Sequence, residues 1–237
     1  MTTRPPDRRE ELATNLERVR RRIADACDHA GRAADDVTLT VVTKFFPASD
    51  VRVLAGLGVR HVGENRHQEA SAKAAECADL DLTWHFIGAL QSNKAAAVPA
   101  YASVVESVDR AKLLAGLARG AEEAGRRLDV LVQVSLDPAS ATGRAGASVG
   151  RVVELADQVA ARPQLRLRGL MAVAPLGQDP QPGFAKLASL AAQVRADHPD
   201  ATWVSAGMSG DLEAAVSCGA THVRIGSAVL GERPAER

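Results

Sequence analysis

Short apolar runs alternate with amphipathic helical segments along most of this 237-residue chain. The apolar runs have the length of buried strands, and each is followed by a helical or turn segment. We predict eight strands, at Thr38–Thr43, Arg60–Gly63, Leu82–Phe86, Ala102–Val105, Asp129–Ser135, Leu165–Leu170, Thr202–Ser205 and Thr221–Ile225. The helical segments between them include residues 48–57, 65–77, 110–124, 148–161, 183–197 and 210–218.

Eight strand–helix units without a break in composition predict a single (β/α)8 TIM barrel, an α/β fold. The competing fold, a doubly wound sheet, needs about six strands and a phosphate-binding loop after the first of them. Here the first strand runs into Lys44-Phe45-Phe46-Pro47 instead. A charged segment from Asp7 to Arg32 carries an apolar stripe, which predicts an added N-terminal helix. We therefore divide the chain into a helix over residues 1–35, packed on the barrel, and a barrel over residues 36–237.

The composition argues against several classes of function. The formal net charge is zero and aromatic residues make up 3%, so we expect no nucleic-acid or membrane partner. No apolar stretch is long enough to span a bilayer, and the first eleven residues lack the apolar core of a signal peptide. The three cysteines and six histidines show no metal-site spacing. We expect reduced thiols, a cytoplasmic protein and no metal.

Lys44 ends the first strand, where a charged side chain is costly unless its amine has a partner or a task. The chain contains 29 Lys and Arg residues, of which only five are lysines. Only lysine can deprotonate to a neutral amine and form an imine with an aldehyde. The alternative is a surface lysine whose stem covers apolar neighbours, and this segment alone leaves the two interpretations equally open.

The loops after the seventh and eighth strands are rich in glycine and serine. Gly207, Ser209 and Gly210 precede a helical segment whose free N–H groups favour an anion. Gly226 and Ser227 form a second turn with small side chains, and these two loops are the usual phosphate position of a barrel. Each loop alone could be an ordinary helix cap or tight turn. Together, opposite the strand-end lysine, they predict a phosphate site, and the combination indicates pyridoxal 5′-phosphate (PLP) as cofactor.

Several segments at the strand ends resemble a known family, the pyridoxal phosphate homeostasis proteins, which are similar to the barrel domain of fold-type III PLP enzymes such as alanine racemase. The resemblance covers nearly all of the chain after the first helix. The segments that carry it are Val42-Thr43-Lys44, Gly63-Glu64-Asn65, Trp84-His85-Phe86-Ile87-Gly88-Ala89-Leu90-Gln91-Ser92-Asn93-Lys94, Arg168-Gly169-Leu170-Met171, Gly207-Met208-Ser209 and Val223-Arg224-Ile225-Gly226.

The resemblance implies a role for each of eight residues. It makes Lys44 the Schiff-base lysine, which holds the cofactor as an internal aldimine. It places Arg224 against the pyridine nitrogen and Asn65 in the same pocket. The phosphate is held by Ser209, Gly226 and Ser227, with backbone help from Gly207 and Met208.

The sequence predicts a binding protein and no catalysis. An arginine at the pyridine nitrogen keeps the ring unprotonated and weakens carbanion stabilisation. Racemisation also needs a second acid or base, which similar enzymes take from a tyrosine of a second domain. The chain ends soon after the eighth strand, so we expect that domain to be missing. Its single tyrosine, Tyr101, is expected to pack at the wrong end of the barrel. His85, with no carboxylate evident nearby, is interpreted as a hydrogen-bonded wall residue.

We therefore expect a monomeric protein that buffers PLP or delivers it to PLP-dependent apoenzymes. The alternatives are a small fold-type III amino-acid racemase or lyase and, in a third class, a protein-interaction module without cofactor. A further hypothesis makes Lys94 a transient second acceptor for the aldehyde, against its simpler interpretation as a surface lysine at a helix start.

Overall fold

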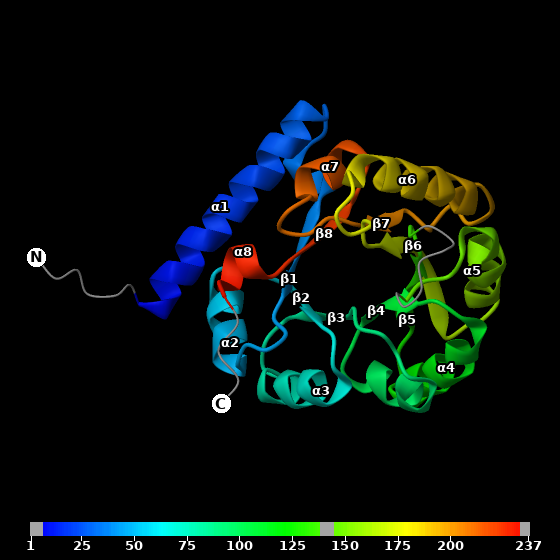
Figure 1. Ribbon diagram of the computed structural model, residues 1–237. Coiled ribbons are helices and arrows are strands. Elements are labelled where there is room, and N and C mark those ends of the chain that lie inside the picture. The colour runs from blue at the N-terminus through cyan, green and yellow to red at the C-terminus, as the bar shows by residue number, and fades with distance from the viewer. Residues whose placement is uncertain (1–6, 138–144, 233–237) are drawn as a thin grey trace, which may run out of the picture.

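The computed structural model describes residues 7–137 and 145–232. Residues 1–6, part of the segment in which we expect no signal peptide, lie outside this range. Eight parallel strands pair in chain order and close into a barrel through pairing of β8 with β1, which confirms the predicted (β/α)8 fold (Figure 1). The strands are β1 Thr38–Val42, β2 His61–Glu64, β3 Thr83–Phe86, β4 Val104–Val108, β5 Leu128–Val134, β6 Leu165–Ala172, β7 Trp203–Ser205 and β8 His222–Ile225.

Helices surround the barrel on its outer face (Figure 1). The α-helices are α1 Arg8–His29, α2 Ala48–Gly56, α3 His67–Glu76, α4 Leu114–Glu123, α5 Val152–Ala160, α6 Pro180–Asp197, α7 Leu212–Ser217 and α8 Ser227–Leu230. Single turns or short runs of 3₁₀-helix are η1 Ala34–Asp36, η2 Ser92–Ala100, η3 Ala111–Leu113 and η4 Val149–Arg151. None of the helices in the described ranges is long and apolar enough to cross a membrane.

The predicted strands lie within a few residues of the observed ones, and the largest difference is at β4. The apolar run predicts an end at Val105, whereas the strand continues through Glu106 to Val108 with all five residues buried. A register irregularity between Val105 and Val108 accompanies this charged residue, as is common where a strand redirects a side chain. The short helix α8 was not predicted, because the alternation signal is weak in such a short piece. Of η2, the sequence indicated only a helix start at Lys94.

The interior of the barrel is unusually polar. Its apolar part consists of Val104, Leu131 and Met171, with Trp203 packed against them. The other buried side chains there include polar and charged groups, namely Thr40, His85, Glu106, Ser205, His222 and Arg224. Barrels are typically filled by branched aliphatic side chains. Because buried polar groups are costly unless they are hydrogen-bonded, the interior of this barrel depends on a specific arrangement of partners.

Gly169 permits the close approach of β6 and β7. It has φ of 147°, and it is paired with Trp203 in the neighbouring strand. A Cβ atom at this position would lie 1.9 Å from the carbonyl oxygen of Trp203. Glycine is therefore required for the barrel to close tightly on this side.

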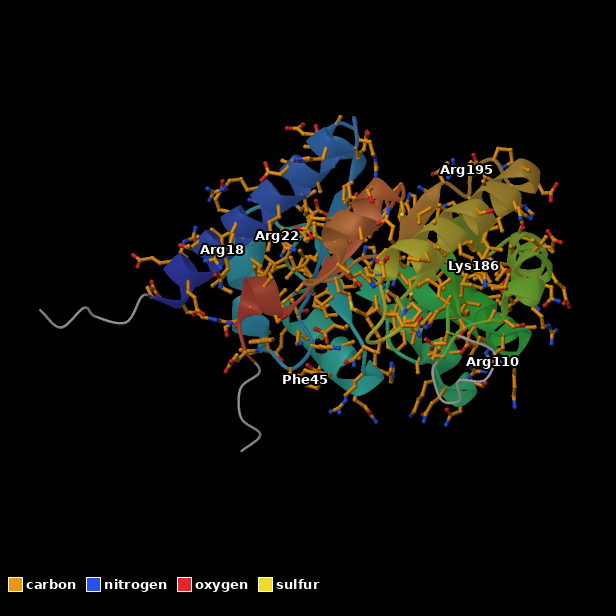
Figure 2. All side chains as sticks on the ribbon, turned by 45° about the horizontal axis from the view of Figure 1, so that its top comes forward. Arg18, Arg22, Phe45, Arg110, Lys186 and Arg195 are labelled. Atoms are coloured by element: carbon orange, nitrogen blue, oxygen red, sulfur yellow. The ribbon has the colours of Figure 1, made fainter. Side chains whose placement is uncertain are left out.

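The N-terminal helix α1 lies outside the barrel and packs against α7, α8 and α2 (Figure 1). Its predicted apolar stripe is buried and consists of Leu12, Leu16, Val19, Ile23 and Cys27. The arginines Arg18, Arg20 and Arg21 of α1 are exposed. Arg22, labelled in Figure 2, differs from these. It donates to both carboxylate oxygens of Glu213, at 2.8 and 2.9 Å, and to the carbonyl oxygen of Ser209 at 3.0 Å.

Candidate functional site

A cavity of about 330 Å³ opens where β1, β7 and β8 end. It brings together five of the eight residues implicated by the sequence, which are Lys44, Met208, Ser209, Gly226 and Ser227. The remaining lining residues are Val42, Phe45, Phe46, Gly210 and Gly231. Closure of the barrel through β1 and β8 causes this proximity, because it places the loop after the first strand beside the loops after the last two.

The backbone at Lys44 is held in an unusual conformation. Phe45 has φ of 72°, which is rare and strained for a residue other than glycine. Its N–H donates to Oε1 of Glu69 at 2.6 Å. On the other side of Lys44, the carbonyl oxygen of Thr43 accepts from the Lys73 amine at 3.0 Å. These two bonds fix the peptide units that flank Lys44, so the direction of its side chain is set by the backbone.

A buried ion cluster provides both of these bonds. The Lys73 amine in α3 lies 2.6 Å from Oε1 of Glu64, at the end of β2, and 3.0 Å from Oε1 of Glu69. The hydroxyl of Thr43 also donates to Oε1 of Glu64, at 2.6 Å. Buried charges need such partners. This cluster was not predicted, although the four-residue spacing of Glu69 and Lys73 in a helix was a signal for it.

The two serines of the expected phosphate site face one another. The hydroxyl of Ser227 donates to that of Ser209 at 3.3 Å, and the backbone N–H of Ala228 lies 3.4 Å from the same Ser209 oxygen. Within the described residues, the backbone N–H groups of Ser209 and Gly210 have no acceptor. Hydroxyls and free backbone N–H groups are the usual ligands of a phosphate oxygen.

Two other residues implicated in phosphate binding have structural tasks. Gly207 is buried with φ of 93°, and a Cβ there would lie 2.7 Å from that of Ala215. It shapes the loop and does not line the cavity. The backbone N–H of Met208 donates to Oδ1 of Asp211 at 2.6 Å, so this N–H is already occupied, while the Met208 side chain lines the cavity.

Asn65 lies in a neighbouring cavity of about 210 Å³ together with Lys94, His67 and Gln91. The carbonyl oxygen of the Asn65 side chain is buried and has no hydrogen-bond partner among the described residues. The ring of Phe45, which lines the Lys44 cavity, has the amine of Lys44 5.8 Å and the guanidinium of Arg66 5.2 Å from its centre. Arg66 lines the cavity of Asn65, so the two cavities are linked through this ring.

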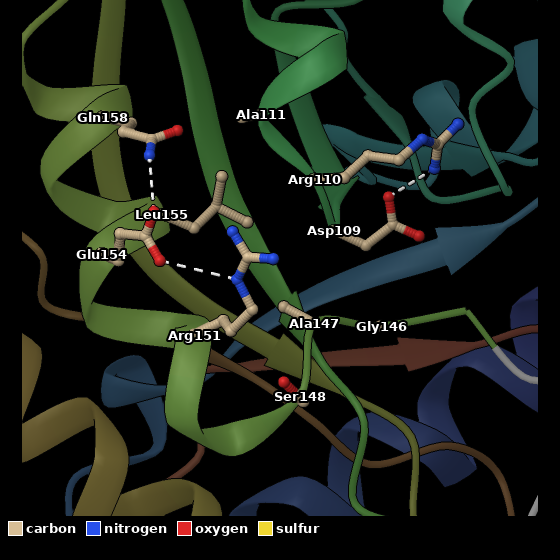
Figure 3. Close-up of a pocket in the computed structure, with 10 residues that line it drawn as sticks. All are labelled: Asp109, Arg110, Ala111, Gly146, Ala147, Ser148, Arg151, Glu154, Leu155 and Gln158. Atoms are coloured by element: carbon tan, nitrogen blue, oxygen red, sulfur yellow. Dashed lines mark hydrogen bonds and ion pairs between the residues drawn. The ribbon is translucent and has the colours of Figure 1, made fainter.

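A separate cavity of about 290 Å³ lies beyond the ends of β4 and β5 (Figure 3). Its charged side chains pair with one another. Arg110 contacts Asp109 at 2.5 Å, and Glu154 contacts both Arg151 at 3.5 Å and Gln158 at 3.1 Å. None of the eight residues implicated by the sequence lines this cavity.

Arg224 does not line the Lys44 cavity. It is buried in β8, two residues before Gly226, which lines the cavity. Its guanidinium donates to the hydroxyl of Ser205 at 2.5 Å and to the carbonyl oxygen of Ala172 at 2.9 Å. Two contacts in two neighbouring strands orient the guanidinium plane.

The expectation that His85 has no carboxylate partner is wrong. Nδ1 of His85 lies 2.7 Å from Oε1 of Glu106, and Nε2 lies 3.0 Å from Nδ1 of His61. The prediction failed because the fourth strand was ended at Val105, which left Glu106 outside the barrel. A carboxylate in the run Val-Val-Glu-Ser-Val was the signal that was missed. His85 is hydrogen-bonded on both sides, as the wall-residue interpretation expects.

Tyr101 packs between the barrel and its outer helices. It contacts the two large apolar clusters, and its hydroxyl lies 3.3 Å from Nδ1 of His67 at the start of α3. Burial raises the pKa of the phenol above its usual value. The side chain does not line the Lys44 cavity, in keeping with a packing role.

Within the described residues, no group of three or more His, Cys, Asp or Glu side chains is arranged to hold a metal ion.

The chain as a whole is similar to known proteins. Residues 14–234 match the family model described as alanine racemase, N-terminal domain. A Mycobacterium tuberculosis protein named pyridoxal phosphate homeostasis protein is 43% identical over 245 residues, which cover 96% of this chain and 95% of that protein. The structure of PipY of Synechococcus elongatus with PLP bound has a TM-score of 0.81 and 37% identity, and it covers 93% of this chain and 100% of that one.

A more distant likeness concerns the fold alone. Alanine racemase of Corynebacterium glutamicum has a TM-score of 0.67 at 14% identity, over 93% of this chain and 60% of the racemase chain. The shared part is the (β/α)8 barrel.

The histidines inside the barrel predict an acid-sensitive fold. Burial, with the neighbouring His85, lowers the pKa of His61 to about 4, and burial lowers that of His222 to about 3. Unfolded histidine titrates near pH ~6.5. Between these values the unfolded chain binds more protons than the folded chain, so the free energy of unfolding falls as pH drops from about 6.5 to about 4.

We expect the free energy of unfolding of the double variant His61→Gln/His222→Gln to depend less steeply on pH in this range. The slope should be smaller by at most about 1.4 kcal/mol per pH unit for each histidine. Urea unfolding at a series of pH values measures this slope. His29→Gln, at an exposed position at the end of α1, is the control. A slope in the double variant equal to that of the control would contradict the assignment.

Proposed function

The chain belongs to the family of pyridoxal phosphate homeostasis proteins, and from this premise we propose that it binds PLP covalently through Lys44 and buffers it or delivers it to PLP-dependent apoenzymes. The observation that carries the proposal is the single cavity in which Lys44 meets the hydroxyls of Ser209 and Ser227. A primary amine and a phosphate site within one small cavity match the two reactive ends of the cofactor.

The residues of the cavity fit this cofactor chemically. When bound, PLP supplies an aldehyde for a primary amine and a phosphate for hydrogen-bond donors. Lys44 provides the amine, on a backbone fixed by Glu69 and Lys73. Ser209 and Ser227 provide hydroxyl donors, and the side chain of neither blocks the cavity. Small residues around the serines allow the backbone to approach the phosphate.

Arg224 is the group that we assign to the pyridine nitrogen. It is buried directly under the cavity, and its orientation is set by Ser205 and Ala172. A guanidinium remains charged at all relevant pH values and can only donate, so it stabilises the unprotonated ring nitrogen. This weakens the electron withdrawal on which reactions of amino acids at Cα depend. We therefore propose that the protein holds the cofactor and does not transform amino acids.

Replacement of Lys44 by alanine is expected to abolish covalent binding, because no amine remains to react. The wild-type protein mixed with PLP should show the visible absorption band of a lysine-bound cofactor. Borohydride reduction should then fix one cofactor on the peptide that contains Lys44, as measured by mass spectrometry. The control Lys186→Ala removes an exposed lysine of α6 (Figure 2) and should behave as wild type. Attachment to a different lysine in the wild-type protein would refute the assignment.

The phosphate assignment predicts a ligand-specific loss. Each hydroxyl bonded to a charged phosphate contributes about tenfold in affinity, so Ser209→Ala/Ser227→Ala should bind PLP at least about tenfold more weakly. Pyridoxal, which lacks the phosphate, should bind the double variant and the wild type equally. Titration by absorbance measures both ligands, with the exposed Ser71→Ala as control. Equal losses for both ligands would show that the serines support the fold instead.

The absence of amino-acid chemistry is tested by isotope exchange. The wild-type protein loaded with PLP is incubated with individual amino acids in deuterium oxide, and exchange at Cα is followed by NMR. We expect no exchange above that caused by free PLP, because the ring nitrogen faces a guanidinium. Rapid exchange with any one amino acid would favour the alternative, a racemase or lyase with the same barrel.

A further inference from the structure

Glu106 lies at the centre of a hydrogen-bonded chain that crosses the barrel. One of its carboxylate oxygens, Oε1, is 2.7 Å from Nδ1 of His85 in β3. The other, Oε2, accepts from the hydroxyl of Ser205 in β7 at 2.6 Å. All three side chains are buried. Glu106 therefore connects opposite walls of the barrel, below the cavity that contains Lys44.

Arg224 is the last member of this chain of hydrogen bonds. Its guanidinium donates to the Ser205 hydroxyl at 2.5 Å and lies 3.7 Å from Oε2 of Glu106. The carboxylate accepts from Ser205, so the hydroxyl proton points to Glu106 and the oxygen lone pairs face Arg224. Ser205 thus links the buried cation to the buried anion, and its orientation is determined by both.

Charge explains why Glu106 is needed. Arg224 is only 4% exposed, and a buried cation without a counter-ion is strongly unfavourable. Burial alone would raise the pKa of Glu106, but the hydrogen bond and charge of His85, the charge of Arg224 and the Ser205 hydroxyl lower it to about 2. The carboxylate is therefore ionised, and it is the carboxylate closest to this guanidinium among the described residues.

The other charged and titratable groups that act on this network come from β2, β6 and β8 and from Asp211 at the start of α7, whose negative charge favours the charged form of Arg224. His61 in β2 is bonded to His85, and His222 in β8 stacks on Trp203 with 4.2 Å between ring centres. The guanidinium of Arg168 in β6 lies over the ring of Trp203, 4.3 Å from the ring centre. Within the described ranges, none of these groups forms a hydrogen bond or ion pair with the guanidinium of Arg224. Its position is therefore determined by the bonds that it donates to Ser205 and Ala172 and by the charge of Glu106.

We propose that Glu106 and Ser205 are positioning residues that hold the Arg224 guanidinium so that one of its remaining N–H groups faces the cofactor ring nitrogen. The inference rests on the proposed PLP binding. It makes this series of hydrogen bonds the source of the protein's selectivity for a ring that contains a nitrogen acceptor. Five N–H groups are available on a guanidinium. Ser205 and Ala172 accept from two nitrogens on the barrel side, which leaves other N–H groups for the cavity side.

The test compares two ligands that differ only at the ring nitrogen. The first is PLP, and the second is its 1-deaza analogue, in which a C–H group replaces that nitrogen. Ser205→Ala removes the linking hydroxyl with little change of volume, and Glu106→Gln removes the charge with almost none. Both variants are expected to bind PLP about tenfold more weakly than wild type and to bind the deaza analogue as wild type does.

Two further variants separate positioning from general damage to the barrel. Ser205→Thr retains the hydroxyl and should restore PLP affinity. Asp129→Asn removes a buried carboxylate that pairs with Arg166 at the N-terminal end of the barrel, away from Arg224. It should leave the affinity for both ligands unchanged. The thermal unfolding temperature of each unloaded variant shows whether a weakened variant is still folded.

Unchanged PLP affinity in Ser205→Ala, or equal losses for PLP and the deaza analogue in a folded variant, would overturn the inference. These results differ from a failure of the proposed function, in which wild-type protein itself forms no borohydride-reducible adduct with PLP. If Glu106→Gln does not fold, Ser205→Ala and its threonine rescue decide the question, because neither changes the buried charge.

Discussion

The pairing of β1 with β8 is the contact on which the rest of the molecule depends. Through it, residues 38–41 lie beside residues 222–225, although most of the chain separates them. Lys44 and the two serines are brought together only because the sheet closes. Loss of this pairing would leave a lysine and a serine-rich loop at opposite edges of an open sheet. The chemistry of the cavity is therefore a consequence of barrel closure and not of any local motif.

A second constraint arises inside the barrel, where polar side chains replace part of the usual aliphatic filling. Each carboxylate there has a cationic or donor partner, as Glu106 has in His85 and Ser205. Such an interior has few alternative packings, because any movement of one group leaves another unsatisfied. The same rigidity benefits the cavity above it, since Arg224 is both the end of the interior network and the base of the site.

Much of this architecture could be predicted from the sequence, for physical reasons that differ between its parts. Parallel strands are buried on both faces, so they appear as short apolar runs, and Lys44 was recognisable as a charge that ends one. Glu106 was not predicted to lie in a strand, because a charged residue inside an apolar run resembles the end of the run. The spacing of Glu69 and Lys73 indicates only that these two side chains can pair on one face of a helix. That Lys73 also reaches Glu64 and the carbonyl oxygen of Thr43 depends on how α3 packs on the strand ends, which no local pattern encodes.

The attachment of α1 has a consequence for how this site can vary between related proteins. Three of its side chains hold the loop after β7 and the helix α8 after β8, and each donates to a backbone carbonyl there. Arg22 donates to Ser209, Asn15 to Val229 and Arg8 to Leu230. Every residue has a carbonyl, so substitutions at these three positions leave the acceptors in place. The loops are thus free to evolve new ligand contacts without detaching the helix that supports them.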